Sequence, residues 1–273
     1  MMRSTDDPRP GGEQSAVAGT SPRTGNPVPE TEVAEMFGRI APAYDRLNTI
    51  MTAGQDGRWR RAAADATGLG QSGSAIDVAC GTGKLAVALA QRVGPFGLVV
   101  GVDLSPAMIR LARRRHRDHV QLRFAEANAL ALPYADGTFD AATIAFGLRN
   151  LSDFTAGLAE MRRVVRPGGR VVCLELTIPR PAWWGRLYLA VFRRLAPLAA
   201  TLFGLGATYR YLPGSLEGFP SVRVLAAAMR GAGLEAVTYR RLGLGAVALH
   251  VGVVPAMAPP RPTDGSPPRP GPG

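Results

Sequence analysis

The chain has 273 residues, of which 46% are hydrophobic, and a formal net charge of +11. This length allows one large or two small domains, and the hydrophobic content allows a full apolar core. The positive charge indicates an anionic partner, either nucleic acid or an acidic membrane surface, unless the arginines only solvate exposed helix faces.

The two ends of the chain differ in composition from its middle. Residues 1–30 are rich in Pro, Gly, Ser and Thr, and residues 256–273 repeat Pro, Arg and Gly. Segments of this kind cannot bury enough apolar surface to fold, so both are predicted to be disordered tails. The folded domain is therefore expected at 31–255.

Cysteine and histidine usage favours a cytoplasmic protein without a metal site. Cys80 and Cys173 lie in apolar runs, as expected of reduced, buried thiols, and the N-terminus has no apolar signal segment. The chain has three histidines without metal-ligand spacing: His116, His119 and His250.

Strand-like and helix-like segments alternate along the first two thirds of the chain. Helices are predicted at 31–47 and 57–66, before the alternation begins. An open, doubly wound α/β sheet follows from this order, with ligands above the carboxyl ends of the strands. The predicted strands are 75–79, 98–103, 120–124, 139–146 and 170–177, and the helices are 83–93, 106–116 (with Ser105 as its cap) and 153–165.

A nucleotide-cofactor site is predicted at the end of the first strand. Gly81 and Gly83 form a Gly-x-Gly turn that lets the backbone approach a ligand, and Asp103 ends the next strand, where it can accept ribose hydroxyls. The glycine spacing also fits a dinucleotide. Asp77 favours S-adenosylmethionine (SAM), because a carboxylate there can hold the amino-acid end of SAM and would repel a pyrophosphate.

Two further observations support SAM over other nucleotides. The run 126–133 follows the third strand and offers a polar side chain and a backbone N–H to an adenine edge. A Walker A motif is excluded, because Val78 stands where its first glycine belongs and Leu85 follows Lys84.

The segment 181–206 is apolar on most faces but contains Arg186, Arg193 and Arg194, which argue against a membrane span. We interpret 181–220 as a helical cover over the substrate pocket that touches lipid. A helix buried by packing alone is the alternative.

The C-terminal part breaks the alternation. A predicted helix at 222–232 precedes two strand-like runs, 234–240 and 245–254, which are separated by a short turn and should pair antiparallel. An antiparallel pair that closes a parallel sheet is the seven-stranded arrangement of class I methyltransferases. The predicted fold is therefore Rossmann-like α/β, with N-terminal helices and a helical lid.

Several segments, in order, resemble the ubiquinone/menaquinone biosynthesis C-methyltransferases (UbiE/MenG type) over 31–254. A lone glycine motif would be weak support, but an ordered set is specific. The segments are YDRLNTIMT at 44–52 with Trp59, FGLRN at 146–150, RVVRPGGR at 163–170, LELT at 174–177, YRYL at 209–212 and VALH at 247–250.

The resemblance implies methyl transfer from SAM to a ring carbon of a reduced polyprenyl quinone. Because a polyprenyl tail does not leave lipid readily, a transient contact with an anionic membrane is expected. The resemblance does not decide whether the quinone is menaquinone or ubiquinone, how long its prenyl chain is, or whether the protein is a homodimer. It also implies SAM contacts from Thr82, Asp103, Asn128 and Ala129. The full candidate SAM site adds Asp77, Gly81, Gly83, Leu104 and the position of Ala145.

The chain departs from the family pattern at four positions. The family usually has a serine at Ala145, an acidic residue at Lys84, a histidine at Asp56 and a serine at Thr52. These departures do not change the expectation that the protein binds SAM, but they leave the exact methyl acceptor open.

Catalysis requires an electron-rich ring aligned with the methyl group. Arg149 and Asn150 are expected to hold the ring phenolate and an ordered water, with charge stabilisation as the role of the arginine. Tyr44 and Tyr209 are expected to bind the ring oxygens, and Glu175 to orient Arg149. The alternatives are that Arg149 forms only a structural ion pair and that Tyr44 and Tyr209 are core residues.

Three other functions share parts of this pattern. A C- or O-methyltransferase for another small aromatic or polyketide-like acceptor would use the same SAM residues. A nucleic-acid methyltransferase is disfavoured, since an Asn/Asp-Pro-Pro-aromatic motif and a cysteine nucleophile are missing after the fourth strand, so no nucleic-acid partner is expected. The third is a non-catalytic SAM-binding protein.

Overall fold

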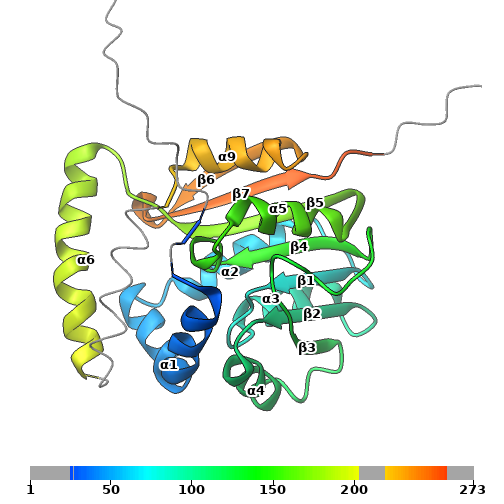
Figure 1. Cartoon of the computed structure of the whole chain (residues 1–273), viewed down its shortest axis with the longest axis horizontal. Coiled ribbons are helices and arrows are strands. Elements are labelled where there is room, and N and C mark those ends of the chain that lie inside the picture. The colour runs from blue at the N-terminus through cyan, green and yellow to red at the C-terminus, as the bar shows by residue number, and fades with distance from the viewer. Residues whose placement is uncertain (1–24, 27, 203–218, 257–273) are drawn as a thin grey trace, which may run out of the picture.

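The computed structural model describes residues 25–26, 28–202 and 219–256 (Figure 1). Tyr209 and most of the two predicted tails, 1–24, 27 and 257–273, lie outside this range. The end of the first predicted tail is part of the fold: the Asn26 N–H donates to the Leu151 carbonyl, and α1 begins at Glu30. The described helices are α1 (Glu30–Met51), α2 (Asp56–Ala66), α3 (Lys84–Val93), α4 (Pro106–Arg115), α5 (Phe154–Arg163), α6 (Ala182–Leu202) and α9 (Val222–Gly231), with short 3₁₀ turns η1 (Leu148–Asn150) and η2 (Gly243–Gly245).

Seven strands form one sheet in the order β3-β2-β1-β4-β5-β7-β6, as predicted for the fold. The first five strands pair in parallel, and β7 pairs antiparallel with both β5 and β6. Their bounds are β1 (Ser74–Val78), β2 (Leu98–Asp103), β3 (Leu122–Glu126), β4 (Phe139–Ala145), β5 (Val165–Leu176), β6 (Glu235–Leu242) and β7 (Val247–Val253).

The sheet separates two apolar layers, because neighbouring residues of a strand point to opposite faces. Ala75 packs in one layer with Trp59 of α2 and Leu89 of α3. Ile76, the next residue, packs in the other layer with Leu158 of α5. Helices on both faces of a mostly parallel sheet bury its central strands, which explains their continuous apolar runs.

Three local predictions were wrong in detail. The third strand begins at Leu122 instead of residue 120, because Val120 is exposed on the preceding turn. The fifth strand begins at Val165, five residues early, because the Pro-Gly-Gly segment bulges within the strand and Gly168 donates to the Val254 carbonyl. Ser105 precedes α4, but its side chain makes no capping hydrogen bond.

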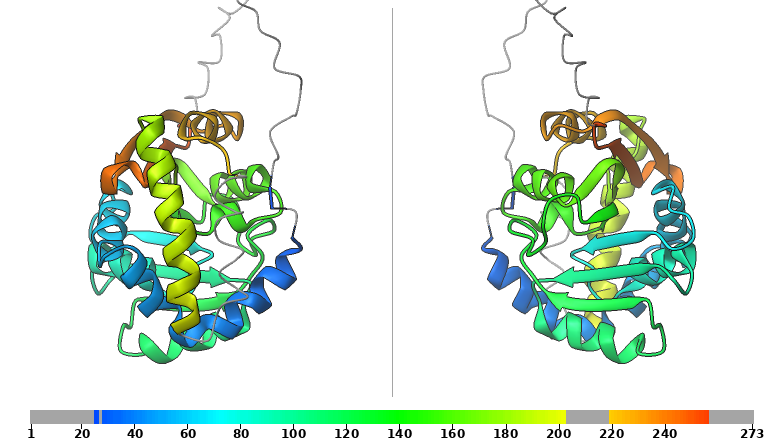
Figure 2. Two further views of the ribbon diagram at one scale, coloured as in Figure 1. Left: turned by 90° about the vertical axis from the view of Figure 1, so that its left-hand side faces the viewer. Right: turned by 90° about the vertical axis from the view of Figure 1, so that its right-hand side faces the viewer.

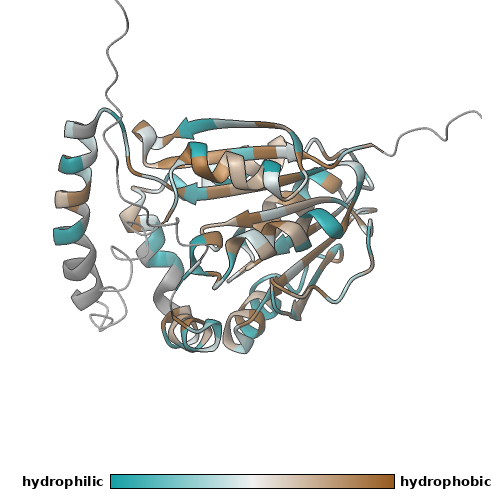
Figure 3. Cartoon of the chain, turned by 45° about the horizontal axis from the view of Figure 1, so that its top comes forward, coloured by the Kyte–Doolittle hydropathy of each residue, from teal (hydrophilic) through white to brown (hydrophobic). Residues whose placement is uncertain are grey.

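α1 and α6 lie beyond the carboxyl ends of the parallel strands. α6 stands beside α1 in Figure 1 and crosses in front of the strand ends in the left view of Figure 2. The described residues of α6 include both hydrophobic and hydrophilic ones, interspersed along the helix (Figure 3). Within the described ranges, no helix has the length and apolar character needed to cross a bilayer.

Candidate active site

The loop between β1 and α3 brings the backbone close to the cofactor position. Gly83 has φ +85°, and a Cβ there would meet the ring of Phe124 at 2.8 Å. Gly81 has φ +55°, also in the region that favours glycine. The loop therefore requires these two glycines, and it ends at the N-terminus of α3.

Asp103 organises this loop from the end of β2. Its Oδ2 accepts the Gly81 N–H at 2.8 Å, and its Oδ1 accepts the Ser105 N–H at 2.9 Å. Burial raises the pKa of this carboxyl, and the two backbone hydrogen bonds offset part of the rise. Each carboxylate oxygen keeps a lone pair, so Asp103 can still accept two ligand hydroxyls.

A cavity of about 90 Å³ opens over this loop. α1 covers it with Val33, Ala34 and Phe37, a role that the sequence alone did not indicate. Most of the predicted cofactor residues meet here: Gly81, Asp103, Leu104, Asn128, Ala129 and Ala145, together with Asn150.

Asp77, Thr82 and Gly83 are not part of this lining. Asp77 is buried in β1, where its Oδ1 accepts the Thr143 hydroxyl at 2.8 Å. Its Oδ2 has no hydrogen-bond partner among the described residues, and burial raises its pKa to about 7. Thr82 points to α1, where its hydroxyl donates to Asp45 Oδ1 at 2.9 Å.

A second cavity, of about 260 Å³, lies between α1, α2 and α6. Its walls are mostly apolar, and its polar groups include Asp56, Arg60 and Arg149. Phe37 and Phe146 line both cavities and thus form the boundary between them. The arrangement suits a polar cofactor on one side and a larger apolar ligand on the other.

The structure separates Arg149 from Asn150. Arg149 lines the larger cavity, and Asn150 lines the smaller one, whereas the sequence predicted both residues beside the acceptor ring. Arg149 forms a buried ion pair, with Nη1 at 2.6 Å from Glu175 Oε1, and it also donates to the Phe146 carbonyl at 2.7 Å. Glu175 therefore orients Arg149, as the sequence suggested.

Tyr188 of α6 also lines the larger cavity, although the sequence indicated only a cover helix there. Burial raises the pKa of Tyr188, and the charge of Arg149 offsets part of that rise. In the sequence, nothing distinguished Tyr188 from the other residues of this apolar helix as a cavity residue. Of the two tyrosines predicted to bind substrate, Tyr44 belongs to α1, without a described side chain, and Tyr209 lies outside the described residues.

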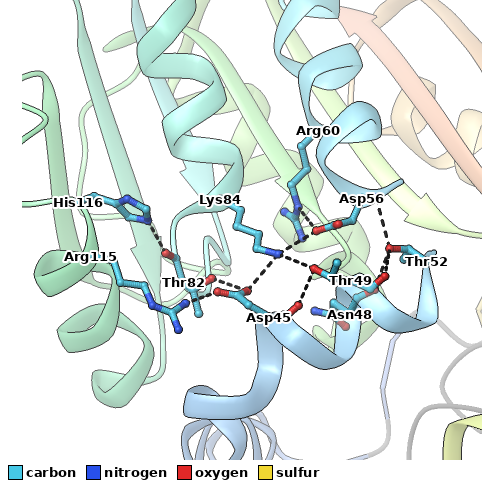
Figure 4. A network of polar contacts seen from close by, with 10 residues as sticks. All are labelled: Asp45, Asn48, Thr49, Thr52, Asp56, Arg60, Thr82, Lys84, Arg115 and His116. Carbon is cyan, nitrogen blue, oxygen red and sulfur yellow. Dashed lines mark hydrogen bonds and ion pairs between the residues drawn. The ribbon is translucent and has the colours of Figure 1, made fainter. Parts of the chain in front are cut away.

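A polar network joins α1, α2 and α4 to the cofactor loop (Figure 4). Lys84 Nζ lies 3.0 Å from Asp56 Oδ2 and 3.7 Å from Asp45 Oδ1, and Arg115 pairs with the same Asp45. Two of the four departures from the family pattern, Lys84 and Asp56, are therefore partners. In the described part of the chain, no cluster of His, Cys, Asp and Glu could hold a metal.

The strand order, the glycine loop and the acidic residue at the end of β2 define a class I SAM-dependent methyltransferase. The chain belongs to the ubiE/COQ5 methyltransferase family, whose model matches residues 26–254. It is an enzyme whose methyl donor is SAM.

Relatives and solved structures agree with this assignment. The chain is 45% identical to the demethylmenaquinone methyltransferase of Thermus thermophilus, over 80% of this chain and 99% of that protein. It is 38% identical to the ubiquinone/menaquinone biosynthesis C-methyltransferase UbiE of Geobacter sulfurreducens, over 81% and 87%. A SAM-dependent methyltransferase from Aquifex aeolicus shares the fold, with a TM-score of 0.53, 18% identity and coverage of 70% and 87%.

Proposed function

We propose that this enzyme methylates a ring carbon of demethylmenaquinol, the reduced polyprenyl quinone. The observation that carries the proposal is the pair of cavities that meet at Phe37 and Phe146. The smaller one holds the predicted ribose acceptor Asp103, and the larger one is apolar, with buried Arg149 in its wall. Relatives named for demethylmenaquinone methylation support the choice of acceptor.

When bound, SAM supplies an electrophilic methyl group. The boundary at Phe146 would align the acceptor ring carbon with that methyl, and such alignment can contribute about 7–11 kcal/mol. Arg149 would stabilise the negative charge of an ionised ring hydroxyl, which makes the adjacent carbon nucleophilic. A guanidinium is a poor base, so the hydroxyl proton would leave to water, and after methyl transfer the hydrogen of the methylated ring carbon would leave to water as well.

This function is tested with purified protein, SAM and short-chain demethylmenaquinol under reducing conditions. We expect one methyl group on a ring carbon, identified by mass spectrometry and NMR. A benzoquinol analogue and simple naphthols are the comparison acceptors. Methylation of an oxygen, or preference for the simple naphthols, would favour the small-aromatic methyltransferase instead.

Asp77 predicts a pH dependence of SAM binding. Its pKa is raised to about 7 in the free protein, and the cationic end of SAM would favour the carboxylate. Binding would then release a proton below pH 7, so affinity should rise as the pH is raised from about 6 to 8. Calorimetry across this range is expected to show the rise in wild type and its loss in Asp77→Asn. Asp118→Asn, at an exposed site, is the control.

If Asp77→Asn keeps the pH dependence of the wild type, the cationic end of SAM lies elsewhere. Titrations in buffers of different ionisation enthalpy measure the released proton directly, which separates linkage at Asp77 from a change of the protein's fold.

An apolar stripe on α6 supports contact with lipid. Trp183, Leu187 and Val191, at helical spacing of four residues, are 63%, 49% and 45% exposed. Trp184 and Tyr188, on the same helix, line the larger cavity. A polyprenyl tail resists leaving lipid, because each buried CH₂ contributes roughly 0.8 kcal/mol. We infer that the enzyme meets the membrane at this helix, as a cytoplasmic, peripheral protein.

We expect the protein to co-sediment with anionic vesicles at low salt and to dissociate at high salt. The exposed Arg186, Arg193 and Arg194 can each contribute about 1 kcal/mol near an anionic surface. Replacing all three with Gln should weaken vesicle binding and leave SAM affinity unchanged. The matched control replaces three exposed arginines near α4: Arg110, Arg114 and Arg117.

Equal loss of vesicle binding in both triple variants would indicate general charge attraction without a role for α6. If the wild type ignores vesicles and methylates a water-soluble acceptor well, the membrane-quinone proposal fails.

A further inference from the structure

Arg60 of α2 is a buried cation in the wall of the larger cavity. It is only 7% exposed, and its Nε has no hydrogen-bond partner among the described residues. A buried guanidinium nitrogen without a hydrogen bond is costly, so Nε of Arg60 favours a ligand in the cavity that can accept one.

The acidic neighbour of Arg60 is shared with another cation. Asp56 Oδ2 lies 3.9 Å from Arg60 Nε and 3.0 Å from Lys84 Nζ. Two cations thus face one carboxylate, and the closer one is Lys84 (Figure 4). By contrast, Arg149 and Glu175 form a one-to-one pair at 2.6 Å. The carboxylate nearest to Arg60 is therefore farther away than the one paired with Arg149, and Asp77 adds a further electrostatic interaction with Arg60.

Arg60 also lies at the boundary between the two cavities. Its guanidinium carbon is 5.1 Å from the centre of the Phe146 ring, while Arg149 donates to the carbonyl of the same residue. Both arginines therefore contact the residue beside which the acceptor ring and the methyl group would meet. An aromatic acceptor with two oxygens could be held by both.

We propose that Arg60 is a second acceptor-binding residue, whose guanidinium binds an ionised ring oxygen of the aromatic acceptor alongside Arg149. The identity of the acceptor as a quinol rests on the proposed function, but the chemistry that Arg60 recognises, an anionic oxygen on an aromatic ring, does not. Asp56 is then a positioning residue for the guanidinium, and Lys84, which lies closer to the same carboxylate, limits how far Asp56 neutralises it.

The test uses 1-naphthol as probe, because its neutral and ionised forms differ in absorbance. Bound to the wild-type protein, naphthol should ionise at a lower pH than in water. Arg60→Gln should weaken the anion's binding by about ten- to hundred-fold, which moves its ionisation upward by about one to two pH units. Arg60→Met keeps the apolar stem and should act alike, and Arg60→Lys should restore part of the shift.

The matched control is Arg61→Gln, since Arg61 is the next residue of α2 and is exposed. It should ionise bound naphthol as the wild type does. SAM affinity should stay unchanged in all four variants, while the acceptor KM rises in Arg60→Gln and Arg60→Met.

Identical ionisation of bound naphthol in wild type, Arg60→Gln and Arg60→Met would overturn the proposal, as would failure of the wild type to bind naphthol. If demethylmenaquinol is not methylated and the shift still depends on Arg60, the proposed function fails and the assignment of Arg60 stands.

Discussion

Replacing Arg149 and Glu175 together with Gln is expected to slow methyl transfer by about 10²–10³-fold, with SAM affinity nearly unchanged. Arg149 lines the larger cavity and not the smaller one, so its charge is expected to act on the acceptor and not on SAM. Single-turnover measurements with saturating SAM report the rate, and calorimetry reports the affinity.

The double variant is needed because both side chains are buried and lie 2.6 Å apart. Arg149→Ala alone would leave the buried Glu175 carboxylate without its cationic partner, which typically costs about 3–5 kcal/mol of stability. Its loss of activity could then reflect unfolding. Glu175→Gln alone would likewise leave Arg149 buried without its counter-charge, so the thermal unfolding of each variant is measured beside its rate.

A double variant that loses SAM affinity and turnover in parallel would show that the Arg149–Glu175 pair is structural. Tyr188→Phe offers an independent check on the same cavity, because it removes one hydroxyl beside Arg149 without removing a charge.

Asp103→Ala is expected to weaken SAM binding by about ten- to hundred-fold, because hydrogen bonds to a charged acceptor contribute about 1.5–3 kcal/mol. The carboxylate has two roles, since it also accepts the Gly81 and Ser105 N–H groups. Calorimetry measures the affinity, and thermal unfolding without SAM measures how far the loop itself is destabilised.

Asp118→Ala is the matched control, because this exposed aspartate pairs only with exposed Arg117 among the described residues. It should change neither quantity. Normal SAM affinity in Asp103→Ala would show that the cofactor site is misplaced. A loss of thermal stability with normal affinity would leave Asp103 only its role in the loop.

Much of the fold could be predicted from the order of the segments. The strand predicted at 98–103 from an apolar run that ends in a polar residue is confirmed as β2. Such runs predict strands well, because a strand covered on both faces is apolar along most of its length. The ends of elements were predicted less well. Val120 looked like strand and lies on a turn, since local composition does not reveal which residues find a partner strand.

The sequence sufficed for the glycines and for Asp103. Their chemistry depends on the local chain: a positive φ, a close backbone approach and a carboxylate at the end of a strand. SAM could be predicted as the cofactor for the same reason. In a parallel sheet the carboxyl ends of neighbouring strands lie together, so residues that end successive strands are expected at one site.

Only the tertiary structure decided which cavity each side chain lines. Arg149 and Asn150 are adjacent in sequence and line different cavities, because the short turn η1 sends successive side chains in different directions. Arg60 gave no signal in an arginine-rich chain, because its burial beside Phe146 depends on how α2 packs against the end of β4. Contacts between distant segments set burial and charge compensation, and these in turn set the chemistry of the acceptor cavity.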